Sequence, residues 1–175
     1  MTGRNVTAST LQLLRLKEGA TGGKPVLKAY KDSKGIWTIG YGATWYKDYK
    51  TQRVKQGDVM TLKDAENLLE YHANYFAKAG VNRYIKVPLT QNQFDACLSL
   101  CFNQGEINFR DSRVVAQINA NPKNYTAVAN SFLSYENTNR RKEEANLYAK
   151  ADAIIKASSA ILGVVVAFFL LKIFI

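Results

Sequence analysis

Two carboxylates and one hydroxyl lie close together near the start of the chain. Glu18 and Asp32 lie on either side of the glycine-rich stretch "GATGGKP", and Thr38 follows in "GIWTIGYG". A glycosidic bond resists hydrolysis because its leaving alcohol is poor and the developing oxocarbenium ion is unstable. Enzymes therefore usually flank the bond with a proton-donating carboxylic acid and an ionised carboxylate. These residue types fit that chemistry, with Glu18 as the proton donor and with Asp32 and Thr38 holding one water between them.

The elements expected around these residues agree with this division of roles. The stretch "LQLLRLKEG" predicts a short helix that begins after a cap at Ser9 or Thr10 and ends near Gly19, so Glu18 lies at a helix C-terminus. The negative end of a helix dipole favours the protonated form of a carboxyl group. Asp32, in the polar turn "DSKG", suits the ionised role. Spacing alone does not establish a site, because many loops place solvated acids near a threonine.

The rest of the chain predicts a small sheet followed by helices. Residues 25–60 combine β-branched and aromatic residues with glycine turn signals, which indicates a small antiparallel sheet. Capping residues and apolar periodicity predict four later helices, which begin at Thr61, Thr90, Asn121 and Asn139. The first of them is expected to stop at Gly80, and the third to have Pro122 in its first position. This order predicts an α+β domain with a cleft between a sheet lobe and a helical lobe.

The two cysteines and the single histidine do not form a recognisable metal motif. Cys97 and Cys101 lie four positions apart on one face of the helix that "QFDACLSLCF" predicts, and His72 belongs to a separate amphipathic segment. Zinc sites usually need four ligands, so we expect two buried thiols and a core or boundary histidine instead. No metal and no cofactor is predicted.

The composition describes one basic globular domain. At 175 residues, 47% of them apolar, the chain is long enough for one ordinary core and too short for two. Its 24 basic and 14 acidic residues give a formal charge of +10, and the basic residues are spread along the chain. Such a charge attracts polyanions, which include nucleic acid, anionic lipid and acidic cell-wall polymers. A solvated basic surface would have the same composition.

An apolar segment closes the chain. Residues 157–171, "ASSAILGVVVAFFLL", carry no charge, and "IFI" follows Lys172. A spanning helix needs about 20 predominantly apolar residues, and a lysine near its end can reach the headgroups, so residues 157–175 predict a membrane anchor. These features divide a catalytic domain, residues 1–153, from a C-terminal transmembrane helix, residues 154–175. The alternative is a buried C-terminal helix, which would need apolar neighbours on every side.

The stretch "EG…LKAYKDSKGIWTIGYG" resembles the catalytic segment of phage lysozymes, the endolysins of glycoside hydrolase family 24. In that family a glutamate ends the first helix, a "Y-x-D-x-x-G" turn follows, and "T-I-G-x-G" lies on the next strand. The matching positions here are Glu18, Asp32 and Thr38. The resemblance implies a lysozyme-like α+β fold. It also implies hydrolysis, without a cofactor, of the β-1,4 bond between N-acetylmuramic acid and N-acetylglucosamine in bacterial peptidoglycan.

The resemblance covers about residues 9 to 150, with one departure. Thirteen residues lie between Glu18 and Asp32, more than the family usually has, and the surplus fits an inserted loop in "ATGGKP". Downstream, "LSLCFNQG" and "NRRKEEANLY" resemble the family's "F-N-x-G" and "R-R-x-x-E" segments. An arginine of the second segment pairs with the catalytic glutamate in the family, so Arg140 or Arg141 is the expected partner of Glu18. The apolar tail has no counterpart in the usual pattern.

Three functions are compatible with these residues. The first is a membrane-anchored peptidoglycan lysozyme of a phage, which acts in host wall penetration or lysis. The second is a non-catalytic wall-binding or structural membrane protein of a virion that keeps the lysozyme scaffold. The third, a specific nucleic-acid binder, has only the net charge in its favour, because the sequence contains no recognition motif. Retention of Glu18, Asp32 and Thr38 favours the first.

Localisation depends on the tail. Basic residues precede the apolar segment and only Lys172 lies in its far end, so the positive-inside tendency leaves the domain on the cytoplasmic side. The N-terminus has no signal-peptide core. We therefore expect the anchor in an internal membrane of the virion or in the host cytoplasmic membrane. The oligomeric state is not predicted.

Overall fold

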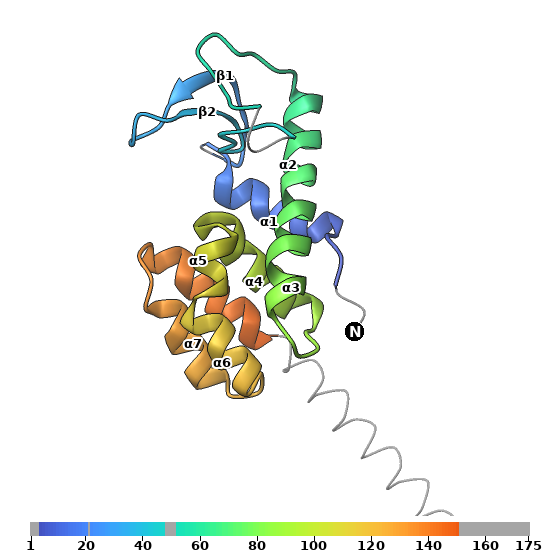
Figure 1. The fold of residues 1–175 in the computed structure, drawn as a ribbon, viewed down its shortest axis with the longest axis vertical. Coiled ribbons are helices and arrows are strands. Elements are labelled where there is room, and N and C mark those ends of the chain that lie inside the picture. Colours follow the sequence, from blue (N-terminus) through green and yellow to red (C-terminus); the bar gives the residue numbers. More distant parts are fainter. Residues whose placement is uncertain (1–3, 21, 48–51, 151–175) are drawn as a thin grey trace, which may run out of the picture.

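The computed structural model describes residues 4–20, 22–47 and 52–150 of the chain. One helix comes first, a two-stranded sheet follows, and helices make up the rest (Figure 1). The elements are α1 Ala8–Glu18, β1 Val26–Lys31, β2 Trp37–Gly40, α2 Leu62–Phe76, the π-helix η1 Ala77–Val81, α3 Asn82–Tyr84, α4 Gln91–Gln104, α5 Glu106–Arg110, α6 Arg113–Ala120 and α7 Tyr125–Leu133. Residues 138–150 are also helical. The predicted α+β class is confirmed.

The α1 helix ends where the sequence predicts but begins earlier. Its cap is Thr7, whose hydroxyl accepts a hydrogen bond from the backbone N–H of Thr10, while the Thr10 hydroxyl accepts one from the N–H of Thr7. The predicted cap at Ser9 or Thr10 is therefore wrong, because this reciprocal pair satisfies two free amides at the helix start. At the other end Glu18 is the last helical residue, as predicted.

The sheet is an antiparallel hairpin, as predicted. Tyr30 pairs with Thr38 and Lys31 with Trp37, and the register shifts between Val26 and Tyr30. The "DSKG" turn closes the hairpin, where the N–H of Gly35 donates to the carbonyl of Asp32. The hairpin therefore brings the segment before Asp32 alongside the strand that contains Thr38.

Two predicted helix boundaries are wrong for physical reasons. Gly80 does not stop the second helix, because the chain continues through η1 into α3. A Cβ on Gly80 would lie 2.3 Å from the Sγ of Cys101, so this glycine allows η1 to pack closely against α4. Pro122 lies outside the next predicted helix, because Asn124 caps α7 by accepting from the N–H of Ala127. The predicted caps at Thr61 and Thr90 are confirmed.

The buried side chains form a large cluster and a smaller one. The large cluster lies among the helices from η1 onward and includes both cysteines, which are free thiols with no exposed surface. The smaller cluster joins α1, α2 and the loop after β2 through Leu14, Tyr41 and Leu69. His72 is buried, and its Nε2 lies 2.9 Å from the carbonyl oxygen of Tyr46. The expected burial of the thiols and the histidine is confirmed.

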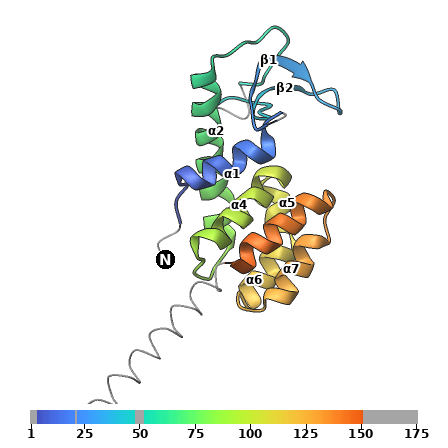
Figure 2. The same ribbon diagram turned by 180° about the vertical axis from the view of Figure 1, so that it is seen from behind.

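The sheet and the α4–α7 helices occupy opposite ends of the described structure. The α2 helix runs from the sheet toward the helical end, and α1 lies between the sheet and the α4–α7 helices in both views (Figures 1 and 2). The C-terminus of α1 thus reaches the junction of the two lobes. No helix within residues 4–20, 22–47 and 52–150 has the length and apolarity that crossing a membrane requires. The predicted anchor and its boundary at residues 153 and 154 lie outside the described residues.

Candidate active site

Glu18 lies at the junction of the sheet lobe and the helical lobe. Its side chain is only 15% exposed, and its Oε1 accepts a hydrogen bond of 2.6 Å from Nη2 of Arg140 in the last described helix. On the other side is Gly42, which follows β2 and has a φ of +81°. A Cβ on Gly42 would lie 4.0 Å from Oε2 of Glu18. The missing side chain therefore leaves space beside the oxygen that Arg140 does not hold.

Asp32 is fixed at the start of the hairpin turn. Its Oδ1 accepts hydrogen bonds from the backbone N–H groups of Lys34 at 2.9 Å and Ile36 at 2.8 Å. The backbone N–H of Asp32 donates in turn to the carbonyl of Ile36. Among the described residues, Oδ2 has no hydrogen-bond donor, so it remains available to a water or a substrate group.

Thr38 is buried on the strand opposite Tyr30. Only 3% of its surface is exposed, and its hydroxyl donates to the carbonyl of Ile36 at 3.0 Å. Ile36 thus contacts both Asp32 and Thr38 through its backbone, which links the two polar side chains. Because the Thr38 hydroxyl proton is already donated, the oxygen is left to accept a hydrogen bond from water.

Arg140 is held by a buried polar group of its own. Its Nε donates to Oε1 of Glu144 at 3.1 Å, and its Nη2 donates to the backbone carbonyl of Ser99 at 2.8 Å. The hydroxyl of Ser99 donates to the same Glu144 oxygen at 2.6 Å. Arg140 and Glu144 are 6% and 3% exposed. The guanidinium group is therefore fixed on several sides before it reaches Glu18.

The neighbouring Arg141 does not contact Glu18. It is fully buried, and its Nη2 donates to the side chain of Asn103 at 3.1 Å. Its Nη1 lies 3.2 Å from Oε2 of Glu144 without hydrogen-bond geometry, and both atoms lack a hydrogen-bond partner among the described residues. Burial lowers the pKa of Arg141 and raises the pKa of Glu144. Of the two arginines expected near Glu18, Arg140 is the one in contact.

Ser99 and Glu144 were not predicted as site residues. Glu144 lies four positions after Arg140 on one helix, a spacing that places side chains next to each other, so this contact could have been inferred from the sequence. Ser99 lies within the apolar helix α4, and only the folded structure brings it to the arginine.

A second polar group joins α1, α2 and the sheet lobe. Glu66 on α2 accepts hydrogen bonds from Arg15 on α1 and from the hydroxyl of Tyr41, which follows β2. The hydrogen bond from Arg15 lowers the pKa of Glu66. Desolvation raises the pKa of Tyr41 to about 12, so its hydroxyl stays protonated and continues to donate. This group fixes the α1 helix to the loop that contains Gly42, and no local sequence pattern indicated it.

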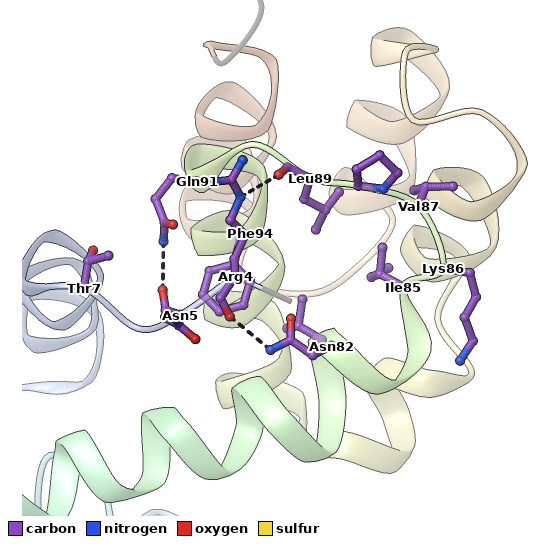
Figure 3. A pocket seen from close by; sticks show the side chains of 12 residues that line it. Arg4, Asn5, Thr7, Asn82, Ile85, Lys86, Val87, Leu89, Gln91 and Phe94 are labelled. Carbon is purple, nitrogen blue, oxygen red and sulfur yellow. Dashed lines mark hydrogen bonds between the residues drawn. The ribbon is translucent and has the colours of Figure 1, made fainter. Parts of the chain in front are cut away.

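A pocket of the structure lies elsewhere (Figure 3). Its volume is about 880 Å³, and it separates the N-terminal segment from the connection between α3 and α4. Hydrogen bonds cross it from Arg4 to the carbonyl of Leu89, from Asn82 to the carbonyl of Arg4, and from Gln91 to the carbonyl of Asn5. Neither acid nor Arg140 lines it. Its polar groups hold the N-terminal segment in place, and the expected cleft between the lobes remains a prediction.

The described residues contain no group of metal ligands at the Glu18 site, at the pocket or elsewhere. In the part of the chain that the structure describes, no three residues among histidine, cysteine, aspartate and glutamate lie close enough together to hold a metal ion. Burial raises the pKa of both cysteine thiols, which keeps them in the protonated form that binds metals poorly.

The chain is similar in sequence and fold to known proteins. The family described as Phage lysozyme matches residues 22–151. The endolysin of Salmonella phage P22 is 37% identical over 131 residues, which cover 75% of this chain and 83% of the relative. The structure of an endolysin from Escherichia coli O157:H7 phage FAHEc1 superposes with a TM-score of 0.71 at 32% identity and covers 84% of this chain and 94% of its own. A P22 lysozyme structure gives 0.66 at 33% identity, with coverage of 85% and 99%.

The family match includes the hairpin that contains Asp32 and Thr38, as well as the helix that contains Arg140. The family match begins four residues after Glu18, so the place of Glu18 is given by its contact with Arg140 and its position beside Gly42. The fold, with a small antiparallel sheet and a larger helical lobe, is lysozyme-like. The chain belongs to the phage lysozyme family and is a muramidase, a hydrolase whose substrate is peptidoglycan.

Proposed function

We propose that Glu18 is the general acid of this muramidase and that Asp32 and Thr38 position the attacking water. The bond cleaved is the β-1,4 linkage between N-acetylmuramic acid and N-acetylglucosamine. The observation that carries the proposal is the ion pair between Glu18 and Arg140, which holds a largely buried carboxyl group at the junction of the lobes. A catalytic acid needs such a fixed orientation, because proton transfer depends on hydrogen-bond reach to the leaving oxygen.

The proposal gives each participating group one role. Oε2 of Glu18, beside Gly42, carries the proton that passes to the glycosidic oxygen as the bond to the anomeric carbon breaks. A water held between Asp32 and Thr38 attacks the anomeric carbon, and Asp32 accepts its proton through Oδ2. The products are two shorter glycan chains, one with a new reducing end. Arg140 does not touch the substrate in this scheme and acts by positioning Glu18.

The Glu18→Gln substitution tests this assignment. The amide has nearly the same shape as the acid but cannot donate the proton, so we expect the release of reducing ends from purified peptidoglycan to fall about a hundred- to ten-thousandfold. Circular dichroism of the same sample must show that the fold is retained. Wild-type rates in the folded Glu18→Gln protein would remove Glu18 from the mechanism.

We also propose that residues 157–175 anchor the enzyme in a membrane and that it acts in host wall penetration or lysis. Support comes from the sequence, where an uncharged stretch over residues 157–171 precedes Lys172 near the end of the chain. The membrane would be an internal one of the virion or the host cytoplasmic membrane. Full-length protein should remain with vesicles in alkaline carbonate, whereas a chain that ends at residue 156 should not. Extraction of both forms alike would contradict an anchor.

A further inference from the structure

Positive charge is concentrated in the sheet lobe. Although basic residues occur throughout the sequence, acidic residues do not: residues 19–57 contain eight lysines and arginines and only two aspartates. This lobe therefore has a formal charge of +6, out of +10 for the whole chain. Residues 58–150 contain eleven basic and ten acidic residues, so the helical part is nearly neutral. The described part of this segment has the same charge, because Asp48 and Lys50 lie outside the described residues and cancel, and this part lies at the end of the structure that contains β1 and β2 (Figure 1).

Half of these basic residues lie on the hairpin itself. They are exposed and fall within residues 24–37, which we name the lysine hairpin: Lys24, Lys28, Lys31 and Lys34. Among the described residues, no carboxylate forms an ion pair with any of them. Ion pairs elsewhere occupy Arg15, Lys17, Arg110, Arg140 and Arg141. The four ammonium groups are thus available to an anionic partner.

Aromatic side chains accompany the lysines. Tyr30 is 39% exposed, and the ammonium group of Lys31 lies 5.5 Å from the ring centroid of the half-buried Trp37. Aromatic rings of this kind offer a flat apolar face with polar edges, which suits contact with the C–H face of a sugar ring. The hairpin therefore combines groups that bind anions with groups that contact carbohydrate.

We infer that the lysine hairpin binds the carboxylate groups of the stem peptides on a peptidoglycan strand. The inference rests on the proposed function, because Asp32 lies on the same hairpin, between Lys31 and Lys34. A glycan strand bound with its scissile bond at Asp32 has to continue along this surface. The lysines then meet the acidic groups of the next saccharide units, and their field raises the local concentration of the polymer.

Binding and cleavage can be measured separately to test this surface. In a full-length Glu18→Gln background, the four hairpin lysines are changed together to glutamine and compared with a matched set on the helical part, Lys63, Lys78, Lys86 and Lys123, which are also exposed. Both sets remove four positive charges. Sedimentation with purified sacculi at low ionic strength gives the dissociation constant, and a series of salt concentrations gives its salt dependence.

We expect the hairpin set to weaken binding about tenfold, as several exposed charge contacts together would, and to flatten the salt dependence. The matched set should change binding less than about twofold, since only its long-range field is lost. Sacculi whose carboxylates have been amidated should bind the parent and the hairpin variant equally. That result would assign the effect to stem-peptide carboxylates rather than to phosphates of other wall polymers.

Three outcomes would overturn the inference. Equal losses in the two sets would mean that only net charge matters. An unchanged difference on amidated sacculi would exclude carboxylates as the ligand. Loss of retention on DNA with normal wall binding would make the hairpin a nucleic-acid surface. The proposed catalytic roles are tested separately, by the release of reducing ends with Glu18 restored. If that test contradicts the catalytic roles, the sedimentation result still decides whether the lysine hairpin binds the wall.

Discussion

Glu144 holds Arg140 from one turn further along the same helix, with 3.1 Å between its Oε1 and the Nε of the arginine. This contact engages the inner edge of the guanidinium group and leaves Nη2 to reach Glu18. Ser99 donates to the same Glu144 oxygen and accepts from Nη2, so it closes the group from α4. Removal of the charge on Glu144 should therefore change the orientation of the Glu18 carboxyl group through Arg140, although the two carboxylates do not contact each other.

The Glu144→Gln substitution is expected to lower kcat roughly ten- to a hundredfold, because small displacements of a catalytic group cost about that much. KM should change little, since Glu144 is buried and cannot meet the polymer. The control is Glu143→Gln at the adjacent position, whose side chain is 61% exposed and contacts Lys17 instead. Steady-state kinetics on peptidoglycan would compare them, with urea unfolding to follow stability. Equal kcat values in the two variants would limit Glu144 to a structural role.

Substitution of Asp32 and Thr38, the residues proposed to position the water, should separate turnover from binding. Asp32→Asn keeps the shape of the side chain and can still accept at Oδ1 from Lys34 and Ile36, but it cannot take a proton from water. Thr38→Ala removes one hydrogen-bond acceptor for that water. We expect a larger fall in kcat for Asp32→Asn than for Thr38→Ala, with wall binding near normal in both. Normal kcat with weakened binding would make both residues substrate contacts instead.

Close packing at Gly80 predicts a stability effect with an internal check. An alanine there would place its Cβ 2.3 Å from Sγ of Cys101, so Gly80→Ala should lower the free energy of unfolding by about 1–3 kcal/mol through overpacking. Cys101→Ala in the same chain should recover part of that loss, because it removes the opposing sulfur atom. A double-mutant cycle from urea denaturation measures the coupling. If the two changes in unfolding free energy simply add, the Cβ at position 80 and Sγ of Cys101 do not oppose each other, and other movements accommodate the alanine.

The single histidine predicts how stability depends on pH. Burial lowers the pKa of His72 in the folded protein below the ordinary histidine value of about 6.5. At a pH below 6.5 the unfolded chain therefore binds a proton at His72 more readily than the folded protein does. The free energy of unfolding should therefore fall as the pH drops through 6.5 toward the folded value. Urea midpoints at pH 7.5 and 5.5 would show this decrease, and His72→Gln should make it smaller. An unchanged decrease in that variant would assign it to other groups.

The local structure of the proposed catalytic segment could be predicted because its signals are local. A helix that ends at Glu18, a turn at Asp32 and a strand through Thr38 each depend on residues within a few positions. The errors arose where a residue has a tertiary role. The sequence predicts a helix stop at Gly80 because glycine commonly ends helices, but its lack of a side chain allows close contact with α4. Pro122 was interpreted as a first helical residue, although Asn124 provides the cap.

The residues that support the site, Ser99 and Glu66, could not be predicted from the sequence for a different reason. Ser99 is one of several polar residues in α4, and Glu66 is one of three acids in the amphipathic α2, so the sequence around each residue does not mark it as special. Each gains its role only when distant segments meet: Ser99 with Arg140, and Glu66 with Arg15 and Tyr41. The pair formed by Arg140 and Glu144 differs from these contacts, because it follows a helical spacing that can be read from one segment.

The separation of Glu18 and Arg140 along the chain, 122 positions, also sets the order in which the site is completed during synthesis. A ribosome that adds about 5–20 residues per second makes Glu18 roughly 6 to 25 seconds before Arg140, and the sheet lobe is also made before that arginine. Until then the carboxyl group has no guanidinium partner to orient it. A chain that terminates before Arg140 therefore carries Glu18, Asp32 and Thr38 but not the contact that fixes the acid. The apolar segment at residues 157–171 is made only after this partner, so synthesis supplies the whole site before it supplies the proposed anchor.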